Sequence, residues 1–148
     1  MRKIIIGNWK AYVNTEREAD ELFSLANSAS SPAFDLVLCP PFPYLEEAKK
    51  NARQFSVGAQ NISSEKEGAH TGEVTPSVLR DLGVTYAIIG HSERRAEGET
   101  DEIINKKMGL ALEAGLSPIL CVGEHLETRQ KGLSAAKHFI QEQLEKDL

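Results

Sequence analysis

Cysteine is scarce in this sequence, and its histidines are widely spaced. The 148 residues include two cysteines, Cys39 and Cys121, and both end apolar runs. Two thiols do not make a disulfide framework, and a thiol at the end of a buried run usually behaves as a small hydrophobe, so we expect both to be reduced. The four histidines, at positions 70, 91, 125 and 138, lack a spacing suited to zinc, and no His-Glu-x-x-His pattern occurs. No metal site is expected.

Long apolar stretches and clusters of basic residues are also missing. No apolar run reaches the roughly 18 residues that a membrane span needs, and no leader-like segment precedes the first strand pattern. The net charge is -5, without the basic and aromatic interleaving of nucleic-acid surfaces. Nucleotide-binding loops of the Gly-x-Gly-x-x-Gly or Walker type are absent. We therefore expect a cytoplasmic protein that binds neither nucleic acid nor membrane.

What is present fits one α/β domain spanning residues 1–148. Hydrophobic residues make up 41% of the chain and charged residues 26%, which is ordinary for a globular domain. Five apolar runs are each followed by a helical pattern, which predicts parallel strands joined by helices. The runs are Ile4–Ile6, Leu36–Leu38, Val57–Ala59, Ala87–Ile89 and Ile119–Val122. A receiver or flavodoxin-like sheet is excluded, because no acidic pair follows the first run and the third ends on Gln60 and Asn61.

Hydroxyl side chains and glycines predict where the helices begin and end. Hydroxyls accept hydrogen bonds from the free N–H groups at a helix start, and glycine adopts the left-handed conformation that often ends a helix. The predicted caps are Thr15 with Glu18 as a capping box, Ser92, Thr100 and Ser134, and the predicted ends are Gly83 and Gly115. Pro43 suits the first position of the second helix.

Two strand ends carry polar residues suited to chemistry. The fourth run leads through Gly90 into His91, at the carboxyl end of a strand, where α/β folds bind ligands. A helix start just after this histidine favours the neutral imidazole, which can donate a hydrogen bond to a substrate carbonyl. A histidine that merely closes a turn fits the same residues. The first run supplies a second polar end, because Lys10 follows it and can direct its ammonium group at an anionic substrate.

Five sequence blocks together resemble the triosephosphate isomerase family. They are Gly-Asn-Trp-Lys at 7–10, Val-Gly-Ala-Gln-Asn at 57–61, Gly-Ala-His-Thr-Gly-Glu-Val at 68–74, Ile-Ile-Gly-His-Ser-Glu-Arg-Arg at 88–95 and Pro-Ile-Leu-Cys-Val-Gly-Glu at 118–124. The resemblance covers the chain from end to end. It implies a TIM barrel and the interconversion of dihydroxyacetone phosphate and glyceraldehyde 3-phosphate, a step of glycolysis and gluconeogenesis that proceeds by proton transfer without a cofactor.

The resemblance also implies roles for individual residues. His91 resembles the neutral electrophile that polarises the substrate carbonyl, and Lys10 the cation that steadies the charge of substrate and enediolate. Glu93 resembles the catalytic-site carboxylate beside this histidine. Asn8, together with Lys10, resembles a contact to the phosphorylated triose.

Part of the family pattern has no counterpart in this sequence. The family's general base lies in a Tyr-Glu-Pro-Val-Trp motif after the sixth strand, and its phosphate loops follow strands seven and eight. Five βα units instead predict an incomplete, open TIM barrel. We expect this chain alone to be inactive or very weak as an isomerase, with a second chain as one source of the remaining units. The alternative is a non-catalytic relic, or a self-assembling or binding module with the same fold origin.

Two surfaces are expected to recruit a partner. The loop from Ile62 to Val74 is long for a βα connection, and the resemblance implies that His70, Thr71, Gly72 and Glu73 insert into a neighbouring subunit. A solvated flexible loop is the other interpretation. The first and fifth strands are apolar edges of an open sheet, and exposed apolar surface of that size ordinarily binds a partner. We therefore expect a homo-oligomer that covers these edges.

Overall fold

The computed structural model describes residues 2–29 and 31–148, so Met1 and Ser30 of the predicted domain lie outside the described residues. Within these ranges the chain forms a five-stranded parallel sheet with the order β1-β2-β3-β4-β5. The strands are β1 (Lys3–Asn8), β2 (Phe34–Cys39), β3 (Ser56–Ala59), β4 (Tyr86–Ile89) and β5 (Ser117–Leu120). The predicted fold, an open half-barrel of parallel βα units, is confirmed.

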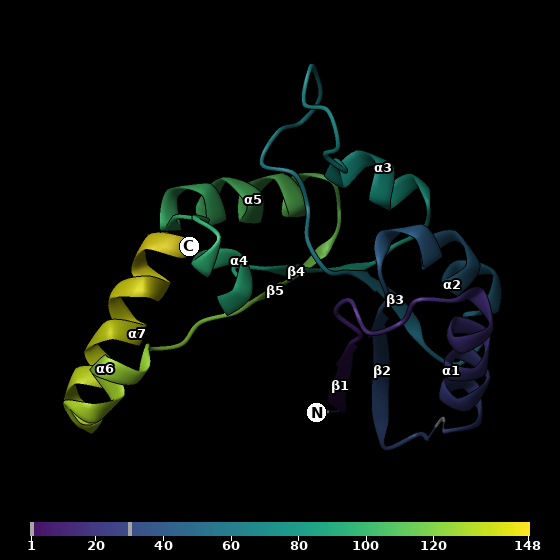
Figure 1. Ribbon diagram of the computed structural model, residues 1–148, viewed down its shortest axis with the longest axis horizontal. Coiled ribbons are helices and arrows are strands. Elements are labelled where there is room, and N and C mark those ends of the chain that lie inside the picture. The colour runs from purple at the N-terminus through teal and green to yellow at the C-terminus, as the bar shows by residue number, and fades with distance from the viewer. Residues whose placement is uncertain (1, 30) are drawn as a thin grey trace.

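Helical segments alternate with the strands along the chain. They are α1 (Glu16–Ser28), the 3-10 turn η1 (Phe42–Tyr44), α2 (Leu45–Asn51), α3 (Pro76–Asp81), α4 (Ser92–Ala96), α5 (Asp101–Glu113), α6 (Leu126–Gln130) and α7 (Leu133–Asp147). Figure 1 shows α1 and α2 together beside the N-terminal half of the sheet, whereas α5, α6 and α7 accompany the β4–β5 half. Among the helices of the described ranges, none is long and apolar enough to cross a bilayer.

Local chemistry explains most helix ends. The Thr15 hydroxyl accepts a hydrogen bond from the Glu18 backbone N at 3.3 Å, and the Glu18 carboxylate accepts one from the Thr15 backbone N at 3.2 Å, so the predicted capping box is confirmed. Thr100 caps α5 as predicted. Gly83 and Gly115 have φ angles of 80° and 76°, the left-handed conformation expected after α3 and α5.

The structure corrects two predicted caps. Ser134 lies inside α7, which begins one residue earlier, after a glycine with a φ of 100°. Ser92 is the first residue of α4 rather than its cap. The cap is His91, whose Nδ1 accepts a hydrogen bond from the backbone N of Glu93 at 3.2 Å. An imidazole nitrogen accepts a hydrogen bond from a free N–H group at a helix start as a hydroxyl does. His91, a predicted site residue, therefore caps α4 itself. The short helix α6 was not predicted.

Alternation along the strands divides their side chains between two faces of the sheet. On β2, Leu36 and Leu38 contact the main core beneath the helices. Val37 and Cys39 point to the opposite face, where they form a smaller cluster with Ile88 of β4. Because helices cover the first face, the main core is there, and the second face corresponds to the interior of a barrel.

The outer edge of β1 is apolar and open. Ile4, Ile5 and Ile6 are 53%, 48% and 40% exposed, and in the described part of the chain no strand pairs with the free edge of β1 or of β5. Beyond β5, Val122 is 38% exposed. The predicted apolar edges are therefore present, and their backbone N–H and C=O groups are free to pair with another chain.

Candidate active site

Lys10 stands just after β1 in a strained backbone conformation that two amide side chains hold in place. Its φ angle is 52°, in the left-handed region that residues with a Cβ rarely adopt. The Asn8 side-chain oxygen accepts a hydrogen bond from the Lys10 backbone N at 3.0 Å, and Gln60 Nε2 donates to the Lys10 carbonyl at 2.9 Å. Gln60 also donates to the Cys39 carbonyl at 2.9 Å. Strain held by surrounding contacts in this way is characteristic of functional sites.

An ion pair joins the ends of two strands that are not neighbours. Lys10 Nζ lies 2.7 Å from Glu93 Oε1, which links the loop after β1 to the start of α4 after β4. Because β2 and β3 separate these strands in the sheet, the contact requires a strongly curved sheet. The hydrogen bond from Lys10 lowers the pKa of the Glu93 carboxyl, and the same bond raises the pKa of Lys10. Both groups are therefore charged at neutral pH.

The hydrogen bond to His91 defines its tautomer. The backbone N–H of Glu93 can donate only to a lone pair, so Nδ1 carries no proton and the neutral ring carries its proton on Nε2. The Glu93 carboxylate is 3.5 Å from the same Nδ1. The His91 side chain is 22% exposed, which leaves it partly accessible. The arrangement thus presents an imidazole N–H donor and an ammonium group at the same edge of the sheet.

A cavity of about 330 Å³ lies against His91 at the carboxyl ends of β4 and β5. Cys121, Glu124 and His125 contribute to its lining. Burial raises the pKa of the Cys121 thiol, so it stays protonated and is a poor nucleophile. Arg129 lies 2.6 Å from Glu124 and its hydrogen bond lowers the pKa of that carboxyl. In the described residues, no group of three or more His, Cys, Asp or Glu is placed to hold a metal ion.

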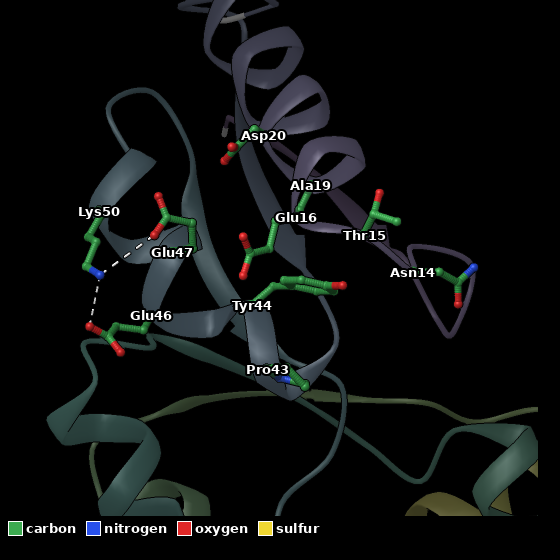
Figure 2. A pocket seen from close by; sticks show the side chains of 10 residues that line it. All are labelled: Asn14, Thr15, Glu16, Ala19, Asp20, Pro43, Tyr44, Glu46, Glu47 and Lys50. Atoms are coloured by element: carbon green, nitrogen blue, oxygen red, sulfur yellow. Dashed lines mark ion pairs between the residues drawn. The ribbon is translucent and has the colours of Figure 1, made fainter.

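A cavity of about 700 Å³ lies elsewhere, between α1 and α2. Figure 2 shows Glu16 of α1 and Glu46 and Glu47 of α2 around it, with the Tyr44 ring below. Lys50 binds Glu46 at 3.0 Å and Glu47 at 3.7 Å, so it neutralises part of the acidic lining. None of the predicted site residues lines this cavity, and its size alone does not make it the site.

The long loop between β3 and α3 is fastened at its base and exposed at its tip. Glu65 binds Lys106 at 2.7 Å and Lys66 binds Glu113 at 2.8 Å, which fixes the base to α5. Residues 67–73 form the tip, which is exposed and projects from the molecule (Figure 1). The predicted interface residues His70, Thr71, Gly72 and Glu73 all belong to this tip. The base is thus held by side-chain contacts, whereas the role of the tip stays a prediction.

Sequence reasoning did not single out two residues that support the site. Gln60 holds the Lys10 backbone, and Arg95 donates to the Gly90 carbonyl at 2.8 Å from its Nε. The signal for Gln60 was its place at the carboxyl end of the third strand, the same criterion that identified His91. Arg95 belongs to a block already quoted, but its partners come from distant elements and could not be predicted from spacing.

The chain is similar to known proteins along nearly its whole length. The family model described as triosephosphate isomerase matches residues 3–148. The chain is 49% identical over 146 residues to the triosephosphate isomerase of Carboxydothermus hydrogenoformans, a match that covers 95% of this chain and 58% of that protein. It is 47% identical over 137 residues to that of Dictyoglomus thermophilum and 43% identical over 134 residues to that of Hahella chejuensis, with 88% of this chain and 54% of each relative covered.

The chain therefore spans little more than half the length of the curated relatives it matches. A match over nearly all of its residues, combined with a confirmed five-unit half-barrel, identifies its origin. The chain belongs to the triosephosphate isomerase family.

Proposed function

We propose that this chain carries the electrophilic half of a triosephosphate isomerase site. The contact that supports the proposal is the Lys10–Glu93 ion pair, because it brings the ends of β1 and β4 together beside His91. Removal of a proton next to a carbonyl places negative charge on the substrate oxygen. An Nε2–H donor and an ammonium group stabilise that charge when they are held in place before the reaction. The substrates are dihydroxyacetone phosphate and glyceraldehyde 3-phosphate.

The general base has to come from outside these 148 residues. Loss of a general base typically costs about a hundred- to ten-thousand-fold in rate. Glu93 lies two residues after His91, and Glu124 lines the same cavity, but each is bound by a cation that lowers its pKa and weakens it as a base. The chain alone is therefore inactive or very weak, and the activity requires the three further βα units. A cytoplasmic location is part of the same proposal.

A coupled isomerase assay with complementation tests this function. The chain is assayed alone and with a separately produced polypeptide that contains the remaining part of the Carboxydothermus hydrogenoformans relative. We expect activity in the mixture and little in either part. Lys10→Ala and His91→Ala are run beside it, because activity that survives in both variants comes from a contaminating host enzyme. A mixture that assembles, yet remains inactive, contradicts the proposal.

The non-catalytic alternative is a self-assembling module with the same fold. The exposed isoleucines of β1 and the projecting tip at residues 67–73 favour it, since both offer surface to a second copy. Self-association is compatible with either function, and we include a homo-oligomer in the proposal. Complementation separates the two functions, because a pure assembly module gains no isomerase activity from the missing units.

A further inference from the structure

Two buried polar side chains of α7 reach the ends of the strands. Gln143, 7% exposed, accepts a hydrogen bond from the backbone N of Gly123 through its Oε1 at 2.9 Å. Asp147, fully buried, lies with its Oδ2 2.5 Å from Arg95 Nη2. The two residues are four positions apart and so share one helix face. Polar groups are costly to bury, so a helix that needed only to cover the sheet would carry apolar residues there.

Arg95 links Asp147 to the ends of the strands. Its Nε donates to the Gly90 carbonyl at 2.8 Å, and its Nη2 also donates to the Cys121 carbonyl at 3.2 Å. Asp101, at the start of α5, binds Nη1 at 2.7 Å. The Arg95 side chain is 12% exposed, so its five donors act largely away from solvent. The guanidinium therefore joins α5 and α7 to the ends of β4 and β5.

The backbone that precedes His91 is shaped around this guanidinium. Gly90 has a φ angle of 71°, and a Cβ built there would lie 2.9 Å from Arg95 Nη2. The Gly90 carbonyl that accepts from Arg95 Nε belongs to the peptide bond whose nitrogen is that of His91. Arg95 therefore holds the carbonyl end of the peptide that leads into His91.

Stability is a weak explanation for the buried carboxylate. Among the described residues, Asp147 Oδ1 has no hydrogen-bond partner although it is buried. A buried ion pair with an unsatisfied oxygen recovers little of the cost of removing two charges from water. The geometry instead accounts for the orientation of Arg95, because the carboxylates of Asp101 and Asp147 bind its planar guanidinium from two sides.

We propose that Asp147 is a positioning residue for His91, which acts through Arg95 to hold the Gly90–His91 peptide and the imidazole beyond it. The inference rests on the proposed function in one respect, namely that His91 is the group that meets the substrate. The contacts of Asp147, Arg95 and His91 all lie within this chain, so their effect on the imidazole can be measured without isomerase activity.

Nitrogen NMR of the imidazole tests the proposal directly. The chain is labelled with ¹⁵N-histidine, and the His91 signals are assigned by their loss in His91→Gln. We expect one fixed tautomer in the wild type, with the proton on Nε2. In Asp147→Asn the separation between the two ring-nitrogen shifts should shrink, because the ring samples both tautomers. Glu145→Gln, an exposed change on the same helix, should leave it unchanged.

Wild-type signals alone can overturn the proposal, which matters if Asp147→Asn fails to fold. Averaged ring-nitrogen shifts in the wild type would mean that the imidazole is not held. A folded Asp147→Asn variant, checked by circular dichroism, with unchanged His91 shifts would also overturn it. In the complemented isomerase, we expect the same variant to lower kcat by about 10- to 100-fold with little change in KM. Absence of all activity in an assembled wild-type mixture contradicts the proposed function and leaves the NMR result valid.

Discussion

Glu93 is the residue that links the two side chains expected to perform the chemistry. Its carboxylate binds Lys10 Nζ at 2.7 Å, and its backbone N–H donates to His91 Nδ1 at 3.2 Å. One residue therefore favours the charged form of the lysine and fixes the tautomer of the histidine. Because the Glu93 side chain is exposed, solvent screens the ion pair. The pair therefore positions Lys10 more than it stabilises the fold.

The pKa of Glu93 tests this link. Its folded-state pKa lies below the ordinary value of 4.5, so the pair stabilises the fold above that pH, and the contribution is lost as the pH falls through the lowered pKa. Lys10→Met should raise the pKa of Glu93 toward 4.5, as measured by NMR titration of its carboxyl carbon. Lys50→Met, which removes a comparable exposed pair on α2, is the control. An unchanged pKa in Lys10→Met would contradict the link.

At the scale of elements, β3 lies close to β2 because it has a glycine where a side chain would point into the inner face. A Cβ built on Gly58 would lie 2.5 Å from Cys39 Sγ and 3.2 Å from Val37 Cγ1. Both neighbours are fully buried and have little room to move. The inner face of the half-barrel is thus closely packed between β2 and β3, even without closure of the barrel.

Two glycine substitutions should have opposite effects on stability. Gly58→Ala overpacks the inner face and should lower the free energy of unfolding by about 1–3 kcal/mol. Gly109→Ala lies in α5, where a new Cβ meets nothing within 4 Å beyond its chain neighbours and the backbone of its own helix in the described residues, and should raise it by about 0.5–1 kcal/mol. Urea unfolding of both variants against the wild type measures the difference. Equal shifts, or a stabilised Gly58→Ala, would show that the inner face is loosely packed.

At the scale of the whole molecule, the open edge of β1 dominates. Three consecutive isoleucines remain substantially exposed, because the described strands supply β1 with a neighbour on one side. Each buried methylene contributes about 0.8 kcal/mol, so a partner that covers this edge gains substantially. The half-barrel is therefore expected to associate through it.

Ile5→Lys is expected to shift the chain toward monomers. A charge on an edge strand opposes pairing with another strand, and Ile5 is already 48% exposed, so the fold itself should tolerate the change. Sedimentation equilibrium measures the mass of both forms. Leu25→Lys, at a 62% exposed apolar position on α1, is the matched control and should retain the wild-type mass. A monomeric wild type would refute association through this edge.

Local sequence patterns were sufficient to predict the strands, most of the helices and the order of both along the chain. Apolar runs such as Ala87–Ile89 predicted strands, and the Thr15 capping box and Gly83 predicted helix ends, because each depends on neighbouring residues alone. The same patterns placed Lys10 and His91 at the carboxyl ends of strands. The cap of α4 was missed, since a histidine side chain can cap only when the loop turns it back onto its own helix.

Contacts between distant residues were decided by the curvature and packing of the sheet. The Lys10–Glu93 pair spans 83 positions and the Arg95–Asp147 pair 52 positions, and no periodicity relates their members. Such pairs depend on the curvature of the sheet and on the packing of the helices against one of its faces. The sequence by itself thus determined which residues capable of chemistry lie at the strand ends. Tertiary packing determined which of those ends meet, because ion pairs and hydrogen bonds depend on distance in space and not on distance along the chain.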